Sequence, residues 1–293
     1  MNDLYVIIIN YNSASDSIEC ISEFEGFFDK RIRCIVVDNE STDDSRFVLK
    51  KTGLFSAVSE NCKSKIVETS EYNNFLVLAN KNYGYAGGVN IVLSVLLEYN
   101  ITCQVLLLNP DIRIDKKSIM EMARVNNSIP DSCVGASVYS YCNRRTLCYY
   151  GGAYLTFYGK PKYTRQKNKT NDFLAGGCIL FHSDVIRING LFPCGYFLYW
   201  EEADWCVSFV QKKGKMLVAY NAIAYDKGGV SINRKSSFAH YHYTYGAILF
   251  ITKYRKNRLI YLYVWLFIKI LANLLLGKKD VSSSLIKAIK DCN

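Results

Sequence analysis

The stretch at residues 105–111 (VLLLNPD) constrains the fold of this chain more than any other. Four consecutive aliphatic residues are typical of a strand that is covered on both faces, as in the middle of a mostly parallel sheet. Pro110 lacks the N–H that a strand ladder needs, so the strand ends there and leaves Asp111 at its carboxyl end. In open α/β sheets, ligands bind at that edge. The stretch therefore predicts a carboxylate at a binding edge, although a Pro-Asp turn with a solvated acid fits the same residues.

Apolar runs at residues 4–9, 33–37, 75–78 and 105–108 predict four strands, each followed by a helical segment. This alternation over the first half predicts a parallel sheet with helices on both faces. After residue 126 the pattern becomes α+β, with strands expected at 133–139, 149–156, 173–181 and 215–225 and helices at 183–189 and 200–213. We expect one domain over residues 1–232, divided near residue 126, and a separate tail over 233–293.

Composition narrows the class of protein. Half of the 293 residues are hydrophobic and 21% are charged, which is typical of a globular chain. The 11 cysteines are odd in number and form no Cys-x-x-Cys pair, which favours reduced thiols in a cytoplasm over a disulfide framework or a thiolate metal site. The chain enters a strand directly, without a basic leader, so we expect no signal peptide.

The net charge of +10 is concentrated in the tail, where nine Lys and Arg residues from Lys253 onward face two Asp residues. They flank the almost wholly apolar residues 259–276, and this combination favours an anionic membrane surface over nucleic acid. Eighteen residues is short for a spanning helix, and Lys269 lies in the middle. We expect a helix lying in the membrane interface, with a buried or dimer helix and a spanning helix as alternatives.

Polar residues collect after each predicted strand, and the carboxyl ends of parallel strands meet at one edge of a sheet. Two further clusters follow in the second half of the chain. In order, the six clusters are Asn10-Tyr11-Asn12, then Asp38-Asn39 with Ser41, then Asn82, Gly84 and Asn90, then Asn109 with Asp111, then Gly176-Gly177, and finally Trp200-Glu201-Glu202 with Asp204.

Taken in this order, the clusters resemble the inverting family 2 glycosyltransferases of the GT-A fold. The resemblance is strongest to the rhamnosyltransferase-like branch that builds bacterial surface polysaccharides, and it covers residues 6–231. No single cluster is specific, but the ordered set is. The resemblance implies a Rossmann-like, mostly parallel α/β sheet flanked by helices, with a nucleotide-sugar half at 1–125, an acceptor half at 126–232 and C-terminal amphipathic helices.

The resemblance also implies a role for each cluster. Asp38 would accept a hydrogen bond from a base N–H or a ribose hydroxyl, and glycine at position 84 would let the backbone approach the diphosphate. The residues implied for the nucleotide-sugar site are Asn10, Tyr11, Asn12, Asp38, Asn39, Ser41, Asn82, Gly84, Asn90, Asn109, Gly177 and Trp200.

Asp111 would coordinate Mn²⁺ or Mg²⁺ between the two phosphates, in the place of the fold's Asp-x-Asp motif. Asn109 stands where the first acid of that motif is expected, so one ligand charge is missing. Asp226 stands where relatives usually carry a histidine that reaches the metal or the diphosphate. Asp226 can still act as an oxygen ligand and Lys227 can still meet a phosphate, although a strand-to-turn segment at 225–231 fits the same residues.

The chemistry implied needs a general base, because the acceptor hydroxyl loses its proton as it attacks the anomeric carbon. In the family this base is the second acid of a Glu-Asp pair. The pair here is Glu201-Glu202, which makes Glu202 the expected base, with Asp204 in reserve if the longer side chain is misplaced. The alternative is that the three acids only favour the positive end of their helix.

Competing enzyme classes lack their signals. A nicotinamide enzyme needs Gly-x-Gly-x-x-Gly after the first strand, and a sugar-phosphate nucleotidyltransferase needs a Gly-rich, Arg-bearing loop there, whereas the chain has Asn-Tyr-Asn-Ser. A catalytically weak GT-A membrane scaffold of a polysaccharide assembly complex stays open as the alternative. The hypothesis requires Asp38, Asp111 and Glu202 to converge on one cleft.

We expect a metal-assisted inverting enzyme on the cytoplasmic face of a bacterial inner membrane, held there peripherally. It would transfer sugar from dTDP-rhamnose or a UDP-hexose to a polyprenyl-diphosphate-linked glycan, as in O-antigen or capsule synthesis. Nucleic acid is not an expected partner, and an oligomer is possible.

Overall fold

The computed structural model describes residues 3–24, 32–60, 74–228 and 236–292. Its first half contains the alternating strands and helices that the sequence predicts. In chain order they are β1 (Leu4–Asn10), α1 (Ala14–Ser22), β2 (Ile32–Asp38), α2 (Ser45–Lys51), β3 (Ala57–Glu60), β4 (Asn74–Leu78), α4 (Gly84–Glu98), β5 (Gln104–Leu108), β6 (Ile112–Ile114) and α5 (Lys116–Ser128).

The second half mixes short strands with helices and ends in a helical tail. Its elements are β7 (Ser132–Ser140), β8 (Leu147–Tyr150), β9 (Gly152–Leu155), β10 (Pro161–Tyr163), β11 (Phe173–Leu174), β12 (Cys178–His182), α6 (Asp184–Asn189), α7 (Glu201–Gln211), β13 (Lys215–Asp226), α8 (Ser237–Tyr254), the 3₁₀ helix η1 (Lys256–Arg258), α9 (Leu259–Leu275) and α10 (Lys279–Asp291).

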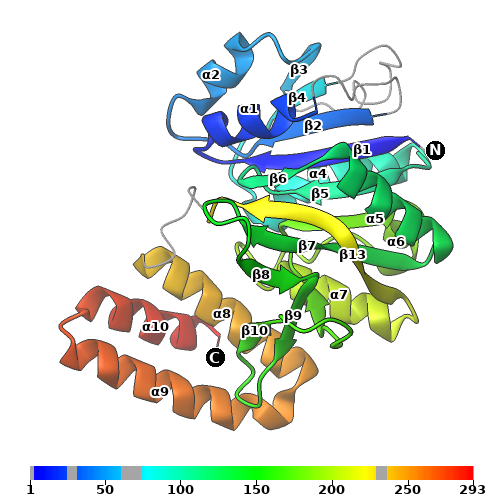
Figure 1. Ribbon diagram of the computed structural model, residues 1–293. Coiled ribbons are helices and arrows are strands. Elements are labelled where there is room, and N and C mark those ends of the chain that lie inside the picture. The colour runs from blue at the N-terminus through cyan, green and yellow to red at the C-terminus, as the bar shows by residue number, and fades with distance from the viewer. Residues whose placement is uncertain (1–2, 25–31, 61–73, 229–235, 293) are drawn as a thin grey trace.

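One large sheet runs through both halves in the order β3-β4-β2-β1-β5-β12-β7-β13-β6, with β8 beside β7 (Figure 1). The strands from β3 to β5 are parallel to one another, as the alternation predicts. The antiparallel strand β12 joins β5 to β7, β13 runs parallel to β7, and β6 closes the edge antiparallel to β13. The expected mostly parallel α/β sheet with flanking helices is confirmed.

Alternate side chains of the central strands point into two cores, which is why these strands are apolar throughout. In β1, Tyr5 and Ile7 pack with α4, α6, α7 and the tail, whereas Val6 and Ile8 pack with α1 and α5. The same alternation holds in β5, where all five residues are buried. The strand predicted from the VLLL run therefore lies between β1 and β12, and it ends just before Pro110.

Two expectations differ from the structure. Residues 149–156 do not form one strand, because the chain turns at Gly151, whose φ is +69°, so that β8 stays on the large sheet and β9 leaves it. β9 instead forms a small antiparallel sheet with β10 and β11. β10 lies between two of the expected strands, in the basic residues 160–169, where no strand was expected. A hairpin consequently links β9 and β10, with its tip at Phe157 and Tyr158.

The tail forms three helices, and Figure 1 shows α8, α9 and α10 beside one another at the end of the molecule opposite β3 and α2. α8 packs closely on the segment before α7, because a Cβ on Gly246 would lie 2.8 Å from Cδ1 of Trp200. In α9 only Leu262 and Leu266 are buried. The expected C-terminal helices are confirmed.

Candidate active site

Two adjoining pockets open at the carboxyl ends of β1, β2, β4 and β5. The α7 pocket, with a volume of about 290 Å³, contains Glu201 and Glu202. The α4 pocket, with a volume of about 330 Å³, contains Tyr11, Asn39 and Asn82. Because they have part of their walls in common, we treat them as two compartments of one cleft. The shared wall residues are Tyr85, Asn109, Asp111, Leu198 and Tyr199.

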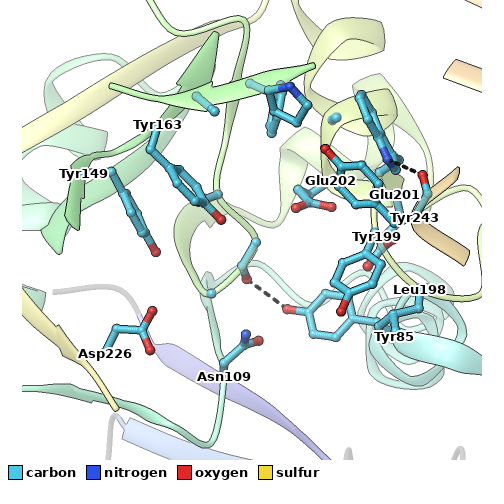
Figure 2. A pocket seen from close by; sticks show the side chains of 18 of the residues that line it. Tyr85, Asn109, Tyr149, Tyr163, Leu198, Tyr199, Glu201, Glu202, Asp226 and Tyr243 are labelled. Carbon is cyan, nitrogen blue, oxygen red and sulfur yellow. Dashed lines mark hydrogen bonds between the residues drawn. The ribbon is translucent and has the colours of Figure 1, made fainter. Parts of the chain in front are cut away.

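An unusual backbone brings the acid pair into the α7 pocket. Tyr199 and Trp200, directly before α7, have φ angles of +67° and +76°, a left-handed region that bulky residues rarely adopt. Such a conformation costs about 1–3 kcal/mol per residue and persists only where the surroundings enforce it. Here the Trp200 indole Nε1 donates to the carbonyl of Tyr243 in α8 (3.0 Å). The sharp turn starts α7 with both glutamates at its first two positions, facing the cavity (Figure 2).

Glu201 is buried and Glu202 is half-buried, and the hydrogen bonding of both acids is incomplete. The Oε2 atom of each is buried and has no hydrogen-bond partner. Burial raises the pKa of Glu202, opposed by backbone hydrogen bonds from Glu202, Gly176 and Trp200. Burial, and then the negative charge of Glu202, raises the pKa of Glu201 well above its usual range. A buried carboxyl with a raised pKa and an unused oxygen is suited to take up a proton from a bound molecule.

Tyr85 at the start of α4 connects the two compartments. Its phenol donates to the carbonyl of Gly176 (3.0 Å), and its backbone N–H donates to the carbonyl of Phe197 (3.1 Å). The preceding Gly84 has a φ of +71°, and a Cβ there would lie 2.2 Å from the Phe197 carbonyl oxygen. Only glycine allows this approach. Gly84 thus fixes the segment before α7 against α4.

Asp111, in the turn before β6, and Asp226, at the end of β13, also line the α7 pocket, and Figure 2 shows Asp226 and Asn109 across from Glu202. Antiparallel pairing of β6 with β13 places Asp226 beside Ile112, and the Lys227 N–H donates to the Asp111 carbonyl (3.0 Å). Burial raises the pKa of Tyr149 well above its usual range, and Tyr163, Asp226, Cys178 and Asp111 add to this shift. The negative charges of Asp111 and Asp226 therefore both raise the pKa of the Tyr149 phenol.

These side chains fit a divalent cation in part. Carboxylate and amide oxygens, as in Asp111, Asp226 and Asn109, are the donors that Mg²⁺ and Mn²⁺ prefer. Within the described ranges, no three His, Cys, Asp or Glu side chains gather closely enough to hold a metal by themselves. The remaining ligands would have to come from a bound diphosphate and water, which is the usual arrangement for Mg²⁺.

Five of the predicted nucleotide-site residues line the α4 pocket: Tyr11, Asn39, Asn82, Gly84 and Asn109. The Asn39 amide donates to Asn82 Oδ1 and to the Gly84 carbonyl, both at 3.0 Å, and accepts from the Tyr83 N–H (3.1 Å). These hydrogen bonds attach the end of β2 to residues 82–84 at the start of α4. Gly177 and Trp200, also predicted, lie in the α7 pocket.

Asp38 is buried behind this wall and does not line either compartment. Its carboxylate accepts from Arg46 Nε (2.5 Å), Asn10 Nδ2 (2.8 Å) and both the Oγ (2.5 Å) and N–H (3.1 Å) of Ser41. These four donors fill both oxygens. Asp38, Asn10 and Ser41 therefore support the cleft from within, and of the three carboxylates expected to converge the structure brings together Asp111 and Glu202. Asn12 is likewise used locally, since its Oδ1 accepts from the Thr42 N–H (2.8 Å).

Three other predicted residues are engaged away from the cleft. The Asn90 amide donates to the Phe192 carbonyl (2.8 Å), and it accepts from the Phe192 N–H (2.9 Å). Lys227 Nζ bonds Asp16 Oδ1 (3.0 Å) in α1. Asp204 is buried and accepts from Tyr196, Tyr254 and Lys253, so α7 is attached to α8 through this acid. Gly229 to Ser231, at the end of the segment with Asp226, lie outside the described residues.

Several aromatic residues of the cleft were not predicted from the sequence. Tyr149 and Tyr163 stack with ring centroids 4.8 Å apart at one side of the α7 pocket, and Tyr243 lines another side. Phe238 closes part of the α4 pocket. Tyr243 and Phe238 belong to α8, so the tail contributes directly to the cleft. Only the position of Tyr85, next to Gly84, offered a signal in the sequence.

The fold is shared with solved structures of glycosyltransferases. A GalNAc-T7 structure with UDP, GalNAc and Mn²⁺ matches with a TM-score of 0.63 and 11% identity over 86% of this chain, which spans 48% of that protein. The mannosyltransferase PcManGT of Pyrobaculum calidifontis, solved with GDP-Man and Mn²⁺, matches with a TM-score of 0.60 and 12% identity over all of this chain and 89% of its own. At such identities the likeness shows the GT-A fold alone.

In sequence, the chain is 25% identical over 215 residues to the low-salt glycan biosynthesis hexosyltransferase Agl10 of Haloferax volcanii. That match covers 70% of this chain and 61% of the relative, so the chain spans less than two thirds of its length. The model of glycosyl transferase family 2 matches residues 5–188, more than half of the chain. The chain therefore belongs to glycosyl transferase family 2.

Proposed function

We propose that the protein transfers a hexose from a nucleoside-diphosphate sugar to a hydroxyl of a lipid-diphosphate-linked glycan, with inversion at the anomeric carbon. The observation that carries the proposal is that Glu201 and Glu202 each keep one buried carboxyl oxygen without a hydrogen-bond partner, in the pocket that Asp111 and Asp226 also line. A purely structural acid has its oxygens satisfied, as Asp38 and Asp204 do. Orphaned acids that face a cavity are the expected mark of a catalytic site.

The donor would occupy both compartments. In the α4 pocket, the Tyr11 and Phe197 rings and the amides of Asn39 and Asn82 offer a surface and hydrogen-bonding groups for a base and ribose. The diphosphate would lie at the shared wall near Asp111 and Asn109. The hexose would then extend into the α7 pocket, where the stacked rings of Tyr149 and Tyr163 suit the apolar face of a sugar.

In the transfer, the acceptor oxygen forms a bond to the anomeric carbon while the bond from that carbon to the diphosphate oxygen breaks. The acceptor proton passes to Glu202, and the electron pair of the broken bond leaves with the nucleoside diphosphate. Glu202 lies across the pocket from Asp226 and Asn109 (Figure 2), which suits attack opposite to the leaving group. Beside it, Glu201 has a pKa raised by burial and then by the negative charge of Glu202.

A Mn²⁺ or Mg²⁺ ion held by Asp111 and Asp226, with Asn109 beside them, would neutralise charge that develops on the leaving diphosphate. The protein offers only two charged ligands there, so the ion and the donor would bind together. The Asp111 and Asp226 carboxylates would then position the diphosphate at the shared wall, on the far side of the sugar from Glu202.

Calorimetric titration of nucleoside diphosphates, with and without Mn²⁺, tests the donor half of the proposal. We expect binding of a nucleoside diphosphate that depends on the metal. A panel of sugar donors, including dTDP-rhamnose and UDP-hexoses, followed by hydrolysis or thermal shift, would then identify the sugar. Absence of any nucleotide binding would contradict the proposal and favour a scaffold that has kept the fold without the activity.

A further inference from the structure

Helix α9 presents a long apolar surface to solvent. Residues Lys256–Leu275 form the one helical stretch of the described chain that is long and apolar enough to cross a membrane, and only 17% of it is buried. Its exposed large side chains recur at helical spacing and lie on one side of the helix. They are Ile260, Tyr261, Val264, Phe267, Ile268, Leu271, Leu274 and Leu275.

The opposite side of α9 is held by the protein. Leu262 and Leu266 are buried and lie with Trp200 and Tyr243 around a small gap of about 10 Å³. Lys269, in the middle of the helix, lies 3.4 Å from Nδ1 of His240 in α8. A helix that crossed a bilayer would have to give up these contacts. The packing therefore favours a helix that lies flat, with one side on the protein and the other on a partner.

The tip of the β9–β10 hairpin extends this apolar surface. Phe157 and Tyr158 are both exposed, and the Phe157 ring lies 4.4 Å from the Tyr261 ring at the start of α9. The hairpin is fixed to the tail, since Arg258 Nη1 donates to the Thr156 carbonyl (3.2 Å). We call the exposed side of α9 together with Phe157 and Tyr158 the docking face.

Charge distinguishes between partners for this face. Lys256 and Arg258 stand at one end of α9 and Lys278 and Lys279 at the other, with Asp280 as the single acid among them. If two copies associated through α9, positive ends would meet positive ends in either a parallel or an antiparallel arrangement. An anionic phospholipid surface attracts both ends at once. Tyr and Phe at the rim also suit a membrane interface.

We propose that the docking face binds the surface of an anionic phospholipid bilayer, with α9 lying in the interface. The hairpin then links the bilayer to catalysis, because Pro161 and Tyr163 of β10 line the α7 pocket. Pro161 is four residues from Phe157, so their Cα atoms are at most about 14 Å apart. This second step rests on the proposed function: the pocket would open beside the bilayer, within reach of the diphosphate headgroup of a lipid-linked acceptor.

Vesicle flotation of the full chain tests the docking face. We expect binding to phosphatidylcholine vesicles that contain about 30% phosphatidylglycerol and much weaker binding to phosphatidylcholine alone. Phe267→Ser and Phe157→Ser should each weaken binding by about tenfold, as expected for one large apolar side chain. Phe47→Ser is the matched control, because Phe47 on α2 is 59% exposed, close to 62% for Phe267 and 57% for Phe157.

Several results would overturn the proposal. If both the Phe267→Ser and the Phe157→Ser variants bind vesicles as strongly as the wild type, the docking face does not bind the membrane. If Phe267→Ser weakens vesicle binding and Phe157→Ser does not, the hairpin is not part of the docking face. If the wild-type chain does not bind vesicles and is a dimer, and the Phe267→Ser variant is a monomer, the partner of the docking face is a second copy of the chain. Circular dichroism checks folding, and nucleotide binding without vesicles is measured in parallel, so that failure of the donor site is seen separately from failure of docking.

Discussion

Buried carboxylates at two sites of the molecule differ in how completely they are hydrogen-bonded: Asp38 in the first half, and the Glu201–Glu202 pair in the second. In the first half, Asp38 is wholly buried and accepts four hydrogen bonds, one of them from the Arg46 guanidinium. In the second half, Glu201 and Glu202 are placed at the start of α7 with one oxygen each left without a partner. A saturated carboxylate fixes the loops around it, whereas an unsaturated one costs stability and keeps its oxygen for a ligand.

The same contrast exists within one turn of α7. Asp204 lies two residues after Glu202, yet it is bonded by Tyr196, Tyr254 and Lys253, at 2.8 to 3.0 Å. Because Lys253 and Tyr254 belong to α8, this acid joins α7 to the tail. We therefore regard Asp204 as a positioning residue. The following predictions test whether complete hydrogen bonding of the carboxylate distinguishes the acids that support the fold from those that react.

The largest effect is expected for Glu202→Gln, which should lower kcat about 10³-fold while nucleotide binding is retained, because a glutamine cannot accept the proton. The variant should unfold at the same or a higher denaturant concentration, since a buried unpaired charge is removed.

Asp204→Asn should show the reverse, with a lower free energy of unfolding and most of kcat kept. Initial rates and urea unfolding measure both variants, and an interchange of their phenotypes would refute the contrast.

Asp38→Asn should lower the free energy of unfolding by about 2–4 kcal/mol, because Asn10, Ser41 and Arg46 would all face an amide that offers one acceptor oxygen. Urea unfolding followed by circular dichroism measures the change. The control is Asp44→Asn, at an exposed position whose side chain makes no capping bond to α2, where about 0.5 kcal/mol or less is expected. Equal stability of Asp38→Asn and wild type would mean that the network does not support the fold.

The sequence predicted the framework of the cleft because its signals are local. The apolar run at 105–108 and the polar residue after each strand depend on burial and strand direction, and both are visible in a few neighbouring residues. Asp111, Tyr11 and Asn82 follow predicted strands and could be placed at this edge on that basis. Glu202 follows no predicted strand, and only the resemblance to family 2 glycosyltransferases implied its place beside Asp111.

What the sequence could not predict depends on contacts across long separations. The saturation of Asp38 requires Asn10, 28 residues away, and that of Asp204 requires Lys253, 49 residues away. The sequence pattern around an acid therefore does not show whether its side chain lines the cleft or is buried behind the cleft wall. Tyr243 joins the α7 pocket only because α8 packs on Trp200, and nothing in the composition of the tail indicates that contact.

Asp111 could be either a supporting acid or an acid that acts on the ligand, and the Asp111→Asn variant distinguishes the two roles. If its carboxylate holds a cation beside the diphosphate, the variant should weaken nucleotide binding about tenfold or more in Mn²⁺ and leave binding in a chelator unchanged. Asp131→Asn, at an exposed acid before β7, is the matched control. Calorimetric titration provides both values. An equal loss with and without Mn²⁺ would assign Asp111 a role in shaping the pocket.

The smallest effect concerns pH. Burial and the charge of Glu202 raise the pKa of Glu201, so the folded state binds the proton more tightly than the unfolded state. The stabilisation this provides is complete below the ordinary carboxyl pKa of 4.5 and is lost as pH rises through the raised value. The loss is at most about 1.4 kcal/mol per pH unit for one group.

Glu201→Gln should remove this dependence. The difference in free energy of unfolding between variant and wild type should therefore move in favour of the variant as pH rises from 4.5, and urea unfolding at a series of pH values measures it. Over the same window the wild-type rate should increase, because Glu202 must lose its proton to act as a base. A constant difference across the window would show that the charge on Glu201 is already compensated in the folded protein, and the contrast with Asp38 would then rest on Glu202 alone.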